Sequence, residues 1–361
     1  MNTTTQLTGP EMSRRQMLYG VLGGAAALAG IDGLPGLVPR SVHAAGVRPL
    51  VFCWLSSGEP ASLASLRRHA STITHLSPTW YRMQSDLSIA GTPDRMVIDF
   101  ARQHGLSLHP TTGNTLTAAS ADPILGTPDA RARAAQNIAQ LVLAQGFDGI
   151  NMDFEGTFGA YRDQYSDLMD RLALRLRPAG KWVTVDVPPV TGNPPSSWAA
   201  AFDYARLGQV CDAVVLMAYD YSVQKPGSIA PLPWVRKAVG YAQAHIPATK
   251  LVVGHPFFGR HWTETSGRFA VTPPLTHTDA LDLLAWSGAT LSRPAPDATP
   301  RFSWSDGGTA HTVHFEDGQS LAAKLGSLDS GIRGVAFWRL GLEDQEQWDA
   351  VDSWVHRRVT G

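Results

Sequence analysis

The sequence predicts an α/β fold, a (β/α)8 TIM barrel with a small α+β insertion between strands seven and eight. After the first 45 residues, short apolar runs alternate with longer amphipathic runs, which is typical of parallel strands joined by helices. About 315 residues of this kind suit a barrel with one insertion. A doubly wound open sheet is the alternative, but no glycine-rich phosphate loop follows the first strand. Eight strand candidates begin at Leu50, Thr72, Leu106, Phe147, Trp182, Asp212, Leu251 and Gly334.

Helices are predicted between these strands where apolar residues recur at three- and four-residue spacing. The segment AYRDQYSDLMDRLALRL is the strongest example, and Pro178 and Gly180 end it. Asp129 to Gly146 and Pro231 to Ile246 behave alike, and the first of these ends on a glycine. In the strongest example, one face carries Tyr161, Tyr165, Leu168, Met169, Leu172 and Leu176.

The alternation breaks once, between Trp262 and about Gly318, where Pro, Thr, Ser and Gly are frequent. We expect an inserted α+β subdomain over about 263–318. It contains one helical stretch, HTDALDLLAW, and one predicted hairpin, FSWSDGGTAHTVHFED, which turns at Asp306 to Gly308.

Composition narrows the possible functions. With 43% hydrophobic and 17% charged residues in 361, the chain can form one large globular domain or two modest ones. A net charge of -1 does not favour nucleic-acid binding. Two cysteines, Cys53 and Cys211, exclude a disulfide scaffold and are read as small buried hydrophobes. Eleven tryptophans hint at flat surfaces that stack on sugar rings.

The N-terminal segment resembles a twin-arginine export signal. Arg14 and Arg15 precede a short apolar run of small residues, and Val42, at the minus-three position relative to Ala44, suits cleavage near Ala44 or Ala45. We therefore divide the chain into a signal peptide over 1–45 and a mature domain over 46–361.

A transmembrane anchor is the alternative reading of this segment. Asp32 and Pro35 interrupt the apolar run well short of the roughly 20 residues that a membrane span needs. We expect a periplasmic or extracellular protein with no stable membrane insertion after cleavage.

The fourth strand carries the strongest chemical signal. Period-two alternation puts Asn151, Asp153 and Glu155 on one face, about 6.5 to 7 Å apart, and this face must point into the barrel. Glu155 lies at the C-terminal end of the strand, where active sites of such barrels form. Two close carboxylates cannot both ionise freely, so we expect Glu155 to keep its proton to a higher pH, as a general acid requires.

The alternative is a purely structural role, in which Asp153 and Glu155 are only polar residues at the end of a strand. It does not explain Asn151, which buries a third polar group deeper in the same row, where each such group costs stability unless it is bonded.

The segment FDGINMDFEG (147–156) resembles the DxxDxDxE signature of family 18 glycoside hydrolases. Asp148, Asp153 and Glu155 match, whereas Asn151 departs. The departure resembles the branch of bacterial spore-cortex-lytic, peptidoglycan-cleaving N-acetylglucosaminidases. Asn151 can hydrogen-bond Asp153 but cannot hold a charge, so proton sharing between two inner aspartates is not expected.

Other segments extend the resemblance. LMAYD (216–220) resembles the MxYD of the sixth strand, which places Met217 and Tyr219 inward by parity. GHPFFGRHW (254–262) looks like the seventh strand, with Phe258 where tyrosine is common. HTVHFEDGQSLAAKL and GVAFWRLGLEDQEQW are similar to the flap and eighth strand of the spore-lytic branch, in which Trp338 would form the aromatic floor under the sugar at subsite -1.

The resemblance implies substrate-assisted, retaining hydrolysis of β-1,4-linked N-acetylglucosamine in peptidoglycan or chitin. Glu155 would protonate the leaving oxygen and later deprotonate water, while the substrate's 2-acetamido carbonyl attacks the anomeric carbon. Asp153 would polarise the acetamido N–H, and Tyr219 would donate a hydrogen bond to its carbonyl oxygen. The expected partner is a polysaccharide, with no metal and no organic cofactor.

Four further residues are candidate sugar contacts, and most of them also have a structural explanation. The resemblance gives Asp220 a role in subsite hydrogen bonding, although it could equally cap the turn after its strand. Trp80, Tyr81 and Asn114 are candidate sugar contacts, with core packing an equal alternative for the two aromatics.

Histidines offer no clear catalytic group. No HExxH motif occurs, and His255 and His261 beside the seventh strand are more often structural than metal ligands.

Two other functions are weighed against this one. The first is a carbohydrate-binding, chitinase-like protein with little or no activity, which the presence of Glu155 disfavours. The second is a conventional two-carboxylate glycosidase with Asp220 as its nucleophile.

Overall fold

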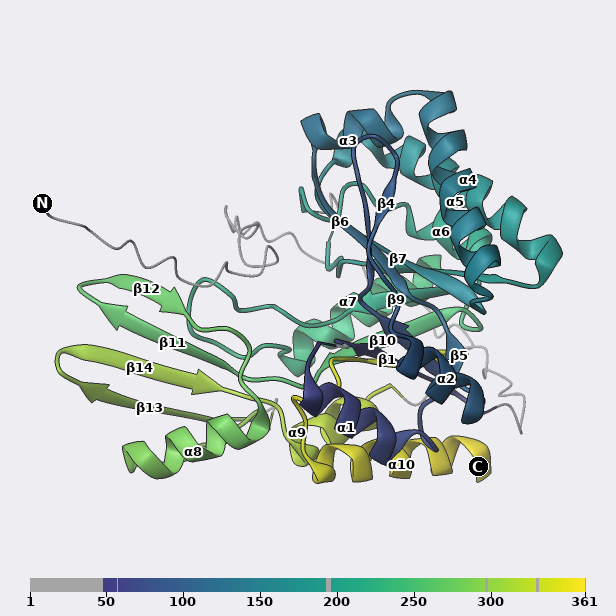
Figure 1. The fold of residues 1–361 in the computed structure, drawn as a ribbon. Coiled ribbons are helices and arrows are strands. Elements are labelled where there is room, and N and C mark those ends of the chain that lie inside the picture. The colour runs from purple at the N-terminus through teal and green to yellow at the C-terminus, as the bar shows by residue number, and fades with distance from the viewer. Residues whose placement is uncertain (1–47, 57, 193–195, 296–297, 329–330, 361) are drawn as a thin grey trace, which may run out of the picture.

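The computed structural model describes residues 48–360 except 57, 193–195, 296–297 and 329–330 (Figure 1). The export signal expected over 1–45 lies outside these residues. The described chain forms a barrel of parallel strands surrounded by helices, with a separate small sheet projecting from one side (Figure 1). The predicted fold class is confirmed.

Eight strand positions form the barrel wall, and each predicted strand is present. The second and third positions are each split into two short strands. In chain order the wall consists of β1 (Leu50–Leu55), β2 (His75–Pro78) with β3 (Tyr81–Met83), β5 (Ser107–Leu108) with β6 (Thr111–Thr117), β7 (Gly149–Thr157), β8 (Trp182–Val187), β9 (Ala213–Met217), β10 (Leu251–Pro256) and β15 (Gly334–Trp338).

The split third strand closes the barrel. Its first half, β5, pairs with β2, and its second half, β6, pairs with β3 on one side and β7 on the other. At the break, the N–H of His109 donates to Leu76 and the carbonyl of Pro110 accepts from Asn151 N–H at 3.0 Å. Pro110 has no N–H to offer, so the ladder changes partner there without leaving a donor unpaired. A short strand, β4 (Ile89–Ala90), adds antiparallel to β3.

Helices cover the outside of the barrel. The fourth helix shows why they begin and end where they do: Thr127 caps it by accepting from Ala130 N–H, Pro128 is its first residue, and Gly146 ends it with φ of 68°. The helices of the barrel layer are α1 (Pro60–His69), α2 (Arg95–Gln103), α3 (Ala118–Leu125), α4 (Pro128–Gln145), α5 (Arg162–Leu176), α6 (Tyr204–Val210), α7 (Leu232–His245), α9 (Gly318–Gly326) and α10 (Gln345–Thr360).

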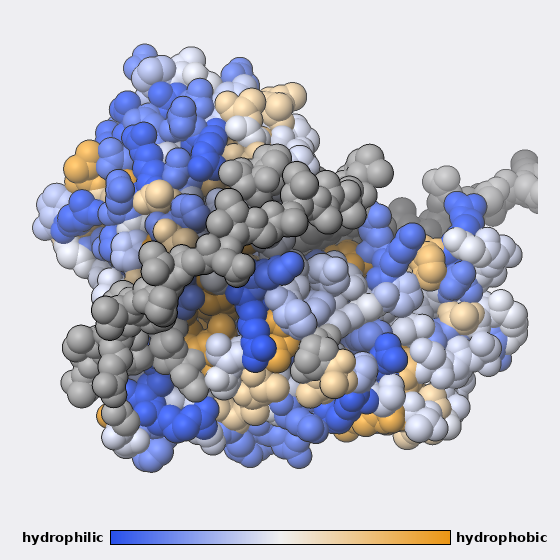
Figure 2. All heavy atoms as spheres, turned by 180° about the vertical axis from the view of Figure 1, so that it is seen from behind, coloured by the Kyte–Doolittle hydropathy of each residue, from blue (hydrophilic) through white to orange (hydrophobic). Residues whose placement is uncertain are grey.

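Apolar side chains pack on both sides of the barrel wall. Leu50, Phe52 and Trp54 of β1 point into the lumen, where they pack with Val215 and Val252. Cys53 points the other way, and Cys53 and Cys211 are both buried and unbridged, as expected. The face behind that of Figure 1 is mostly hydrophilic, with apolar residues showing near its centre and in smaller groups elsewhere (Figure 2). No helix of the described ranges combines the length and apolarity that a bilayer crossing requires.

The insertion is a four-stranded antiparallel sheet with one helix, and its first strand begins three residues before the expected 263. The strand order is β12-β11-β14-β13. The predicted hairpin joins β13 and β14, and its turn uses Gly307 and Gly308 at φ of 53° and 81°. The elements are β11 (Arg260–Thr265), β12 (Arg268–Val271), α8 (His277–Ser287), β13 (Arg301–Asp306) and β14 (Thr309–His314).

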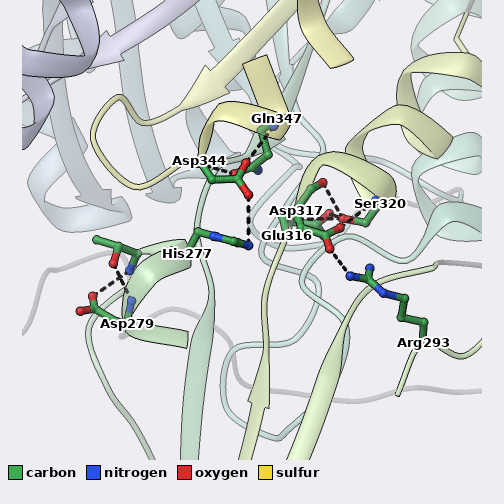
Figure 3. Close-up of polar contacts among 9 residues, drawn as sticks. His277, Asp279, Arg293, Glu316, Asp317, Ser320, Asp344 and Gln347 are labelled. Atoms are coloured by element: carbon green, nitrogen blue, oxygen red, sulfur yellow. Dashed lines mark hydrogen bonds and ion pairs between the residues drawn. The ribbon is translucent and has the colours of Figure 1, made fainter. Parts of the chain in front are cut away.

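Polar contacts fasten the insertion to the barrel (Figure 3). His277 at the start of α8 lies 3.1 Å from Asp344, which precedes α10. Arg293 pairs with Asp317, the residue that caps α9. Lys324 Nζ donates to Glu316 Oε2 at 2.8 Å, with neither side chain more than 1% exposed, and also to Thr299 Oγ1, ahead of β13, at 3.4 Å.

Candidate active site

The polar row of the fourth strand points into the barrel, because its odd-numbered residues alternate with Ile150, Met152 and Phe154 of the outer core. Asn151 is fully buried, Asp153 is half-buried and Glu155 is 7% exposed. The row thus rises from the closed floor of the barrel to its open C-terminal mouth.

Asn151 is bound to the neighbouring strand and not to Asp153. Its Nδ2 donates to Asp186 Oδ2 at 2.7 Å, and its Oδ1 accepts from Thr184 Oγ1 at 2.8 Å. Asp186 and Thr184 lie on β8 and are fully buried. The amide therefore supplies a donor to one neighbour and an acceptor to the other, which a carboxylate could not do.

A pocket of about 310 Å³ opens above this row at the C-terminal ends of β3, β6, β7 and β15. Its size is at the low end of ligand pockets in proteins. Of the sequence-predicted site residues, it brings together Asp153, Glu155, Trp338, Tyr81 and Asn114. The remaining lining residues are Thr79, Arg82, Thr111, Gly113 and Thr115.

Trp338 ends β15 and forms one wall of the pocket. Its ring meets Trp54 edge to face, with ring centroids 5.7 Å apart. The peptide bond that follows, Trp338-Arg339, is cis. Arg339 then forms a bidentate pair with Glu59, at 2.5 and 2.7 Å, which ties the loop after β15 to the start of α1.

Met217 is the last residue of β9 and Tyr219 follows it by two; they are 2% and 3% exposed, and neither lines the pocket. The Tyr219 ring packs edge to face on Phe258 at 6.2 Å. Gly254 of β10 makes room for it, since a Cβ there would lie 3.1 Å from Tyr219 Cε1.

Asp220 is engaged by an arginine of the insertion. Its Oδ1 accepts from Arg260 Nε at 3.1 Å and from Arg260 Nη2 at 2.5 Å. The Asp220 side chain is 10% exposed and that of Arg260 is 4% exposed. Arg260 also lies 5.1 Å from the ring centroid of Phe258. Asp220 has φ of 62°, the left-handed region that aspartate tolerates better than most residues.

The candidates on the second and third strands, Trp80, Tyr81 and Asn114, differ from one another. Trp80 is half-buried against Tyr81 and Phe147 and does not line the pocket. Tyr81 is 6% exposed, and burial raises its pKa to about 12, so the phenol stays protonated. Asn114 Nδ2 donates to the carbonyl of Met83 at 2.7 Å, which fixes the amide at the pocket edge.

His255 and His261 occupy structural positions. His255 is fully buried on the outer face of β10, and burial lowers its pKa to about 3. His261 lies 2.9 Å from His311 within the insertion. No group of three or more potential metal ligands occurs among the residues that the structure describes.

The sequence analysis does not identify two residues of this region, Asp186 and Arg82. Asp186 had a usable signal, because alternation in WVTVDV puts it on the lumen face with Thr184. Arg82 had a weaker one, since only the buried pattern of its neighbours Tyr81 and Met83 turns it toward the pocket.

Comparison of the sequence with known protein families gives one match that includes the fourth strand. The family model described as glycosyl hydrolases family 18 matches residues 95–343. The match spans more than half of the chain, so the protein belongs to glycoside hydrolase family 18.

Individual relatives are moderately distant. The chain is 30% identical over 224 residues to YdhD of Bacillus subtilis, covering 61% of this chain and 53% of that protein. It is 26% identical over 302 residues to the cortical fragment-lytic enzyme of the same species, covering 80% and 69%. The chain thus spans about half the length of the first of these relatives.

Among solved structures, a chitinase from Chromobacterium violaceum has a TM-score of 0.77 at 25% identity, covering 85% of this chain and 99% of that one. The spore cortex-lytic enzyme SleL of Bacillus megaterium also has a TM-score of 0.77, at 24% identity, covering 84% and 73%. The second likeness shows the shared fold alone.

Proposed function

We propose that this protein is an exported hydrolase that cleaves β-1,4 linkages of N-acetylglucosamine-containing glycans, peptidoglycan or chitin, with retention at the anomeric carbon. One observation carries the proposal: Asp153, Glu155 and Trp338 line a single pocket at the C-terminal mouth of the barrel. Cortical fragment-lytic enzymes and a chitinase among the similar proteins support this substrate class.

Glu155 is the proton donor in this mechanism. It protonates the leaving glycosidic oxygen while the carbonyl oxygen of the substrate's own 2-acetamido group attacks the anomeric carbon, which closes a cyclic oxazolinium. Glu155 then takes a proton from water as the water opens that ring, which restores the acid and retains the configuration. Family 18 is an exception to the usual scheme of two catalytic carboxylates.

Asp153 and Tyr219 orient the acetamido group. Asp153 accepts a hydrogen bond from the acetamido N–H and so raises the nucleophilicity of its carbonyl oxygen, and Tyr219 donates to that oxygen. Asn151, held by Thr184 and Asp186, forms a rigid floor under Asp153. A fixed floor favours a near-attack geometry, in which small displacements are costly in rate.

The ion pair of Asp220 supports the substrate-assisted route over a second enzymatic carboxylate. A buried guanidinium already holds the Asp220 oxygen at 2.5 Å. A carboxylate oxygen that already accepts two hydrogen bonds from a guanidinium is a weaker nucleophile.

The central test replaces Glu155 with Gln. Glu155→Gln should keep the fold and remove nearly all turnover of peptidoglycan and chitin oligomers, measured by mass analysis of the products. Glu346→Gln is the matched control, because Glu346 is exposed on α10. Substantial remaining activity in Glu155→Gln would refute the assignment, and a wild-type protein that binds these glycans without cleaving them would favour a binding role.

The stereochemical route has its own test. The first product of the wild-type enzyme should keep the β anomer, followed by proton NMR before mutarotation, and a thiazoline analogue of N-acetylglucosamine should inhibit competitively. An α-anomeric first product, or no inhibition, would contradict the use of the acetamido group.

Export through the twin-arginine pathway is proposed from the N-terminal segment alone, with Arg14 and Arg15 as its key residues. Replacing both with Lys should retain the protein in the cytoplasm of a bacterial host, as fractionation and immunoblotting would show. Unchanged export of this double variant would refute the pathway.

A further inference from the structure

Arg82 is a basic residue at the mouth of the pocket. Its neighbours Tyr81 and Met83 are buried in the hydrophobic core, so alternation along β3 turns Arg82 to the opposite side. Its side chain is exposed and lines the pocket with Asp153 and Glu155. Among the described residues that line the pocket, Arg82 carries the single positive charge.

The guanidinium of Arg82 is available to a ligand. Within the ranges that the structure describes, no hydrogen bond or ion pair engages it, and only its backbone carbonyl is used, by Gln84. By contrast, Arg260 is bound by Asp220 and Arg339, which follows Trp338, is bound by Glu59. Arg82 therefore differs from the structural arginines of the site.

The sheet register aligns Arg82 with the catalytic row. Arg82 pairs with Gly113 on β6, and Gly113 pairs with Asp153 on β7. A Cβ at Gly113 would lie 3.9 Å from Asp153 Oδ2, so this position faces the same space and leaves it open. Two strand spacings, about 9.6 Å, separate the backbones of Arg82 and Asp153. In an alternating strand, the muramic acid next to the N-acetylglucosamine that Asp153 holds would lie within reach of the guanidinium.

The charge of Arg82 distinguishes between the two substrates left open above. Chitin carries no charge, whereas muramic acid in peptidoglycan carries a 3-O-lactyl ether. That lactyl group is an amide while the stem peptide is attached and a free carboxylate once the peptide is removed. Guanidinium groups bind carboxylates through paired, charge-assisted hydrogen bonds.

We propose that Arg82 is a specificity-determining residue that binds the free lactyl carboxylate of a peptide-free glycan strand. This inference rests on the proposed function. It places the enzyme after an amide hydrolysis that separates stem peptide from lactyl group, because that reaction supplies the carboxylate.

The test compares three tetrasaccharides in steady-state kinetics. One contains alternating N-acetylglucosamine and peptide-free muramic acid, the second is the same molecule with its lactyl carboxylates converted to amides, and the third is chitotetraose. Arg82→Gln should lower kcat/KM for the carboxylate form by about 10-fold more than for the other two, and Arg82→Lys should recover part of this loss. Arg133→Gln, which removes one charge from an exposed position on α4, is the control.

Equal losses on all three substrates, or no loss on the carboxylate form, would overturn the role of Arg82. A hyaluronan tetrasaccharide carries its carboxylate on the sugar ring, and a larger Arg82-dependent effect on it would overturn the assignment to the lactyl group.

Binding separates this inference from the proposed function. In a Glu155→Gln background, calorimetry should show tighter binding of the carboxylate form than of the amide form, and the added Arg82→Gln change should remove the difference. Wild-type protein that cleaves none of the substrates would refute the proposed function, while the binding difference decides the role of Arg82 independently.

Discussion

Asn151 on β7 donates a 2.7 Å hydrogen bond to Asp186 on β8, at a depth where neither side chain has any exposed surface. The contact joins two barrel strands below the catalytic row. It also accounts for an asparagine at the position where the family signature has an aspartate, since a second carboxylate here would face Asp186 directly.

The first prediction concerns that contact. Asn151→Asp should destabilise the protein by roughly 2–4 kcal/mol at pH 7, because two carboxylates would then share one buried site. The penalty should shrink at pH 5, where protonating one of them costs less free energy. Urea unfolding at both pH values measures the effect, and a variant as stable as wild type at pH 7 would contradict this account.

The second prediction separates structure from catalysis at Asp220. Asp220→Asn should cost about 3 kcal/mol of stability, because it leaves the buried Arg260 guanidinium without an opposite charge. It should nevertheless keep far more turnover than Glu155→Gln. Thermal unfolding and product release measured on the same samples test both parts, and a complete loss of turnover in a folded Asp220→Asn protein would restore the nucleophile hypothesis.

The third prediction is loss of stability in mild acid. Burial lowers the pKa of His75 to about 4, of His255 to about 3 and of His314 to about 4. Below pH 6.5 these histidines bind protons in the unfolded chain but stay neutral in the folded one. The free energy of unfolding therefore falls as the pH drops from 6.5 toward 4. Each histidine lowers the free energy of unfolding by up to about 1.4 kcal/mol per pH unit in this window.

Urea unfolding between pH 7 and pH 4.5 measures this slope. His255→Leu should reduce it, whereas His356→Leu, at an exposed position on α10, should leave it as in wild type. A stability that stays flat from pH 7 to 4.5 would show that these histidines protonate without unfolding.

The fourth prediction concerns the space behind Tyr219. In Gly254→Ala the new Cβ would lie 2.9 Å from the carbonyl oxygen of Leu216 and 3.1 Å from Tyr219 Cε1, so the strand or the ring must move. We expect a loss of about 1–3 kcal/mol in stability and a fall in kcat of about 10-fold. Gly240→Ala in α7 has no atom within 4 Å of its Cβ and should stabilise the protein slightly. An unchanged kcat in Gly254→Ala would show that Tyr219 tolerates displacement.

Local patterns in the sequence predict much of the fold. The limits of the fourth helix are predictable because Thr127, Pro128 and Gly146 begin and end it through local backbone effects alone. The hairpin turn at Gly307 and Gly308 is readable for the same reason, since its backbone needs positive φ at both positions.

Contacts between distant segments are not readable in this way. The candidate strand from Leu251 runs as one apolar segment, yet the chain leaves the barrel after Pro256 and re-enters a different sheet at Arg260. That change follows from pairing with β14, some 50 residues later. The ion pair of Arg260 with Asp220 and the bonds of Asn151 to β8 are likewise products of the closed barrel. Sequence parity finds the candidate catalytic row, but the partners of that row come from other strands.

The sealed pair of Glu316 and Lys324 sets how the inserted sheet can behave. Lys324 Nζ also donates to Thr299 Oγ1, two residues before β13, at 3.4 Å. Drawing the sheet away from the barrel would break this buried hydrogen bond and admit water beside the Glu316–Lys324 pair, which is costly. The insertion should accordingly act as a fixed wall beside the mouth of the barrel. A long glycan would then thread past an immobile side, and the rate of turnover would not depend on a closing movement of this subdomain.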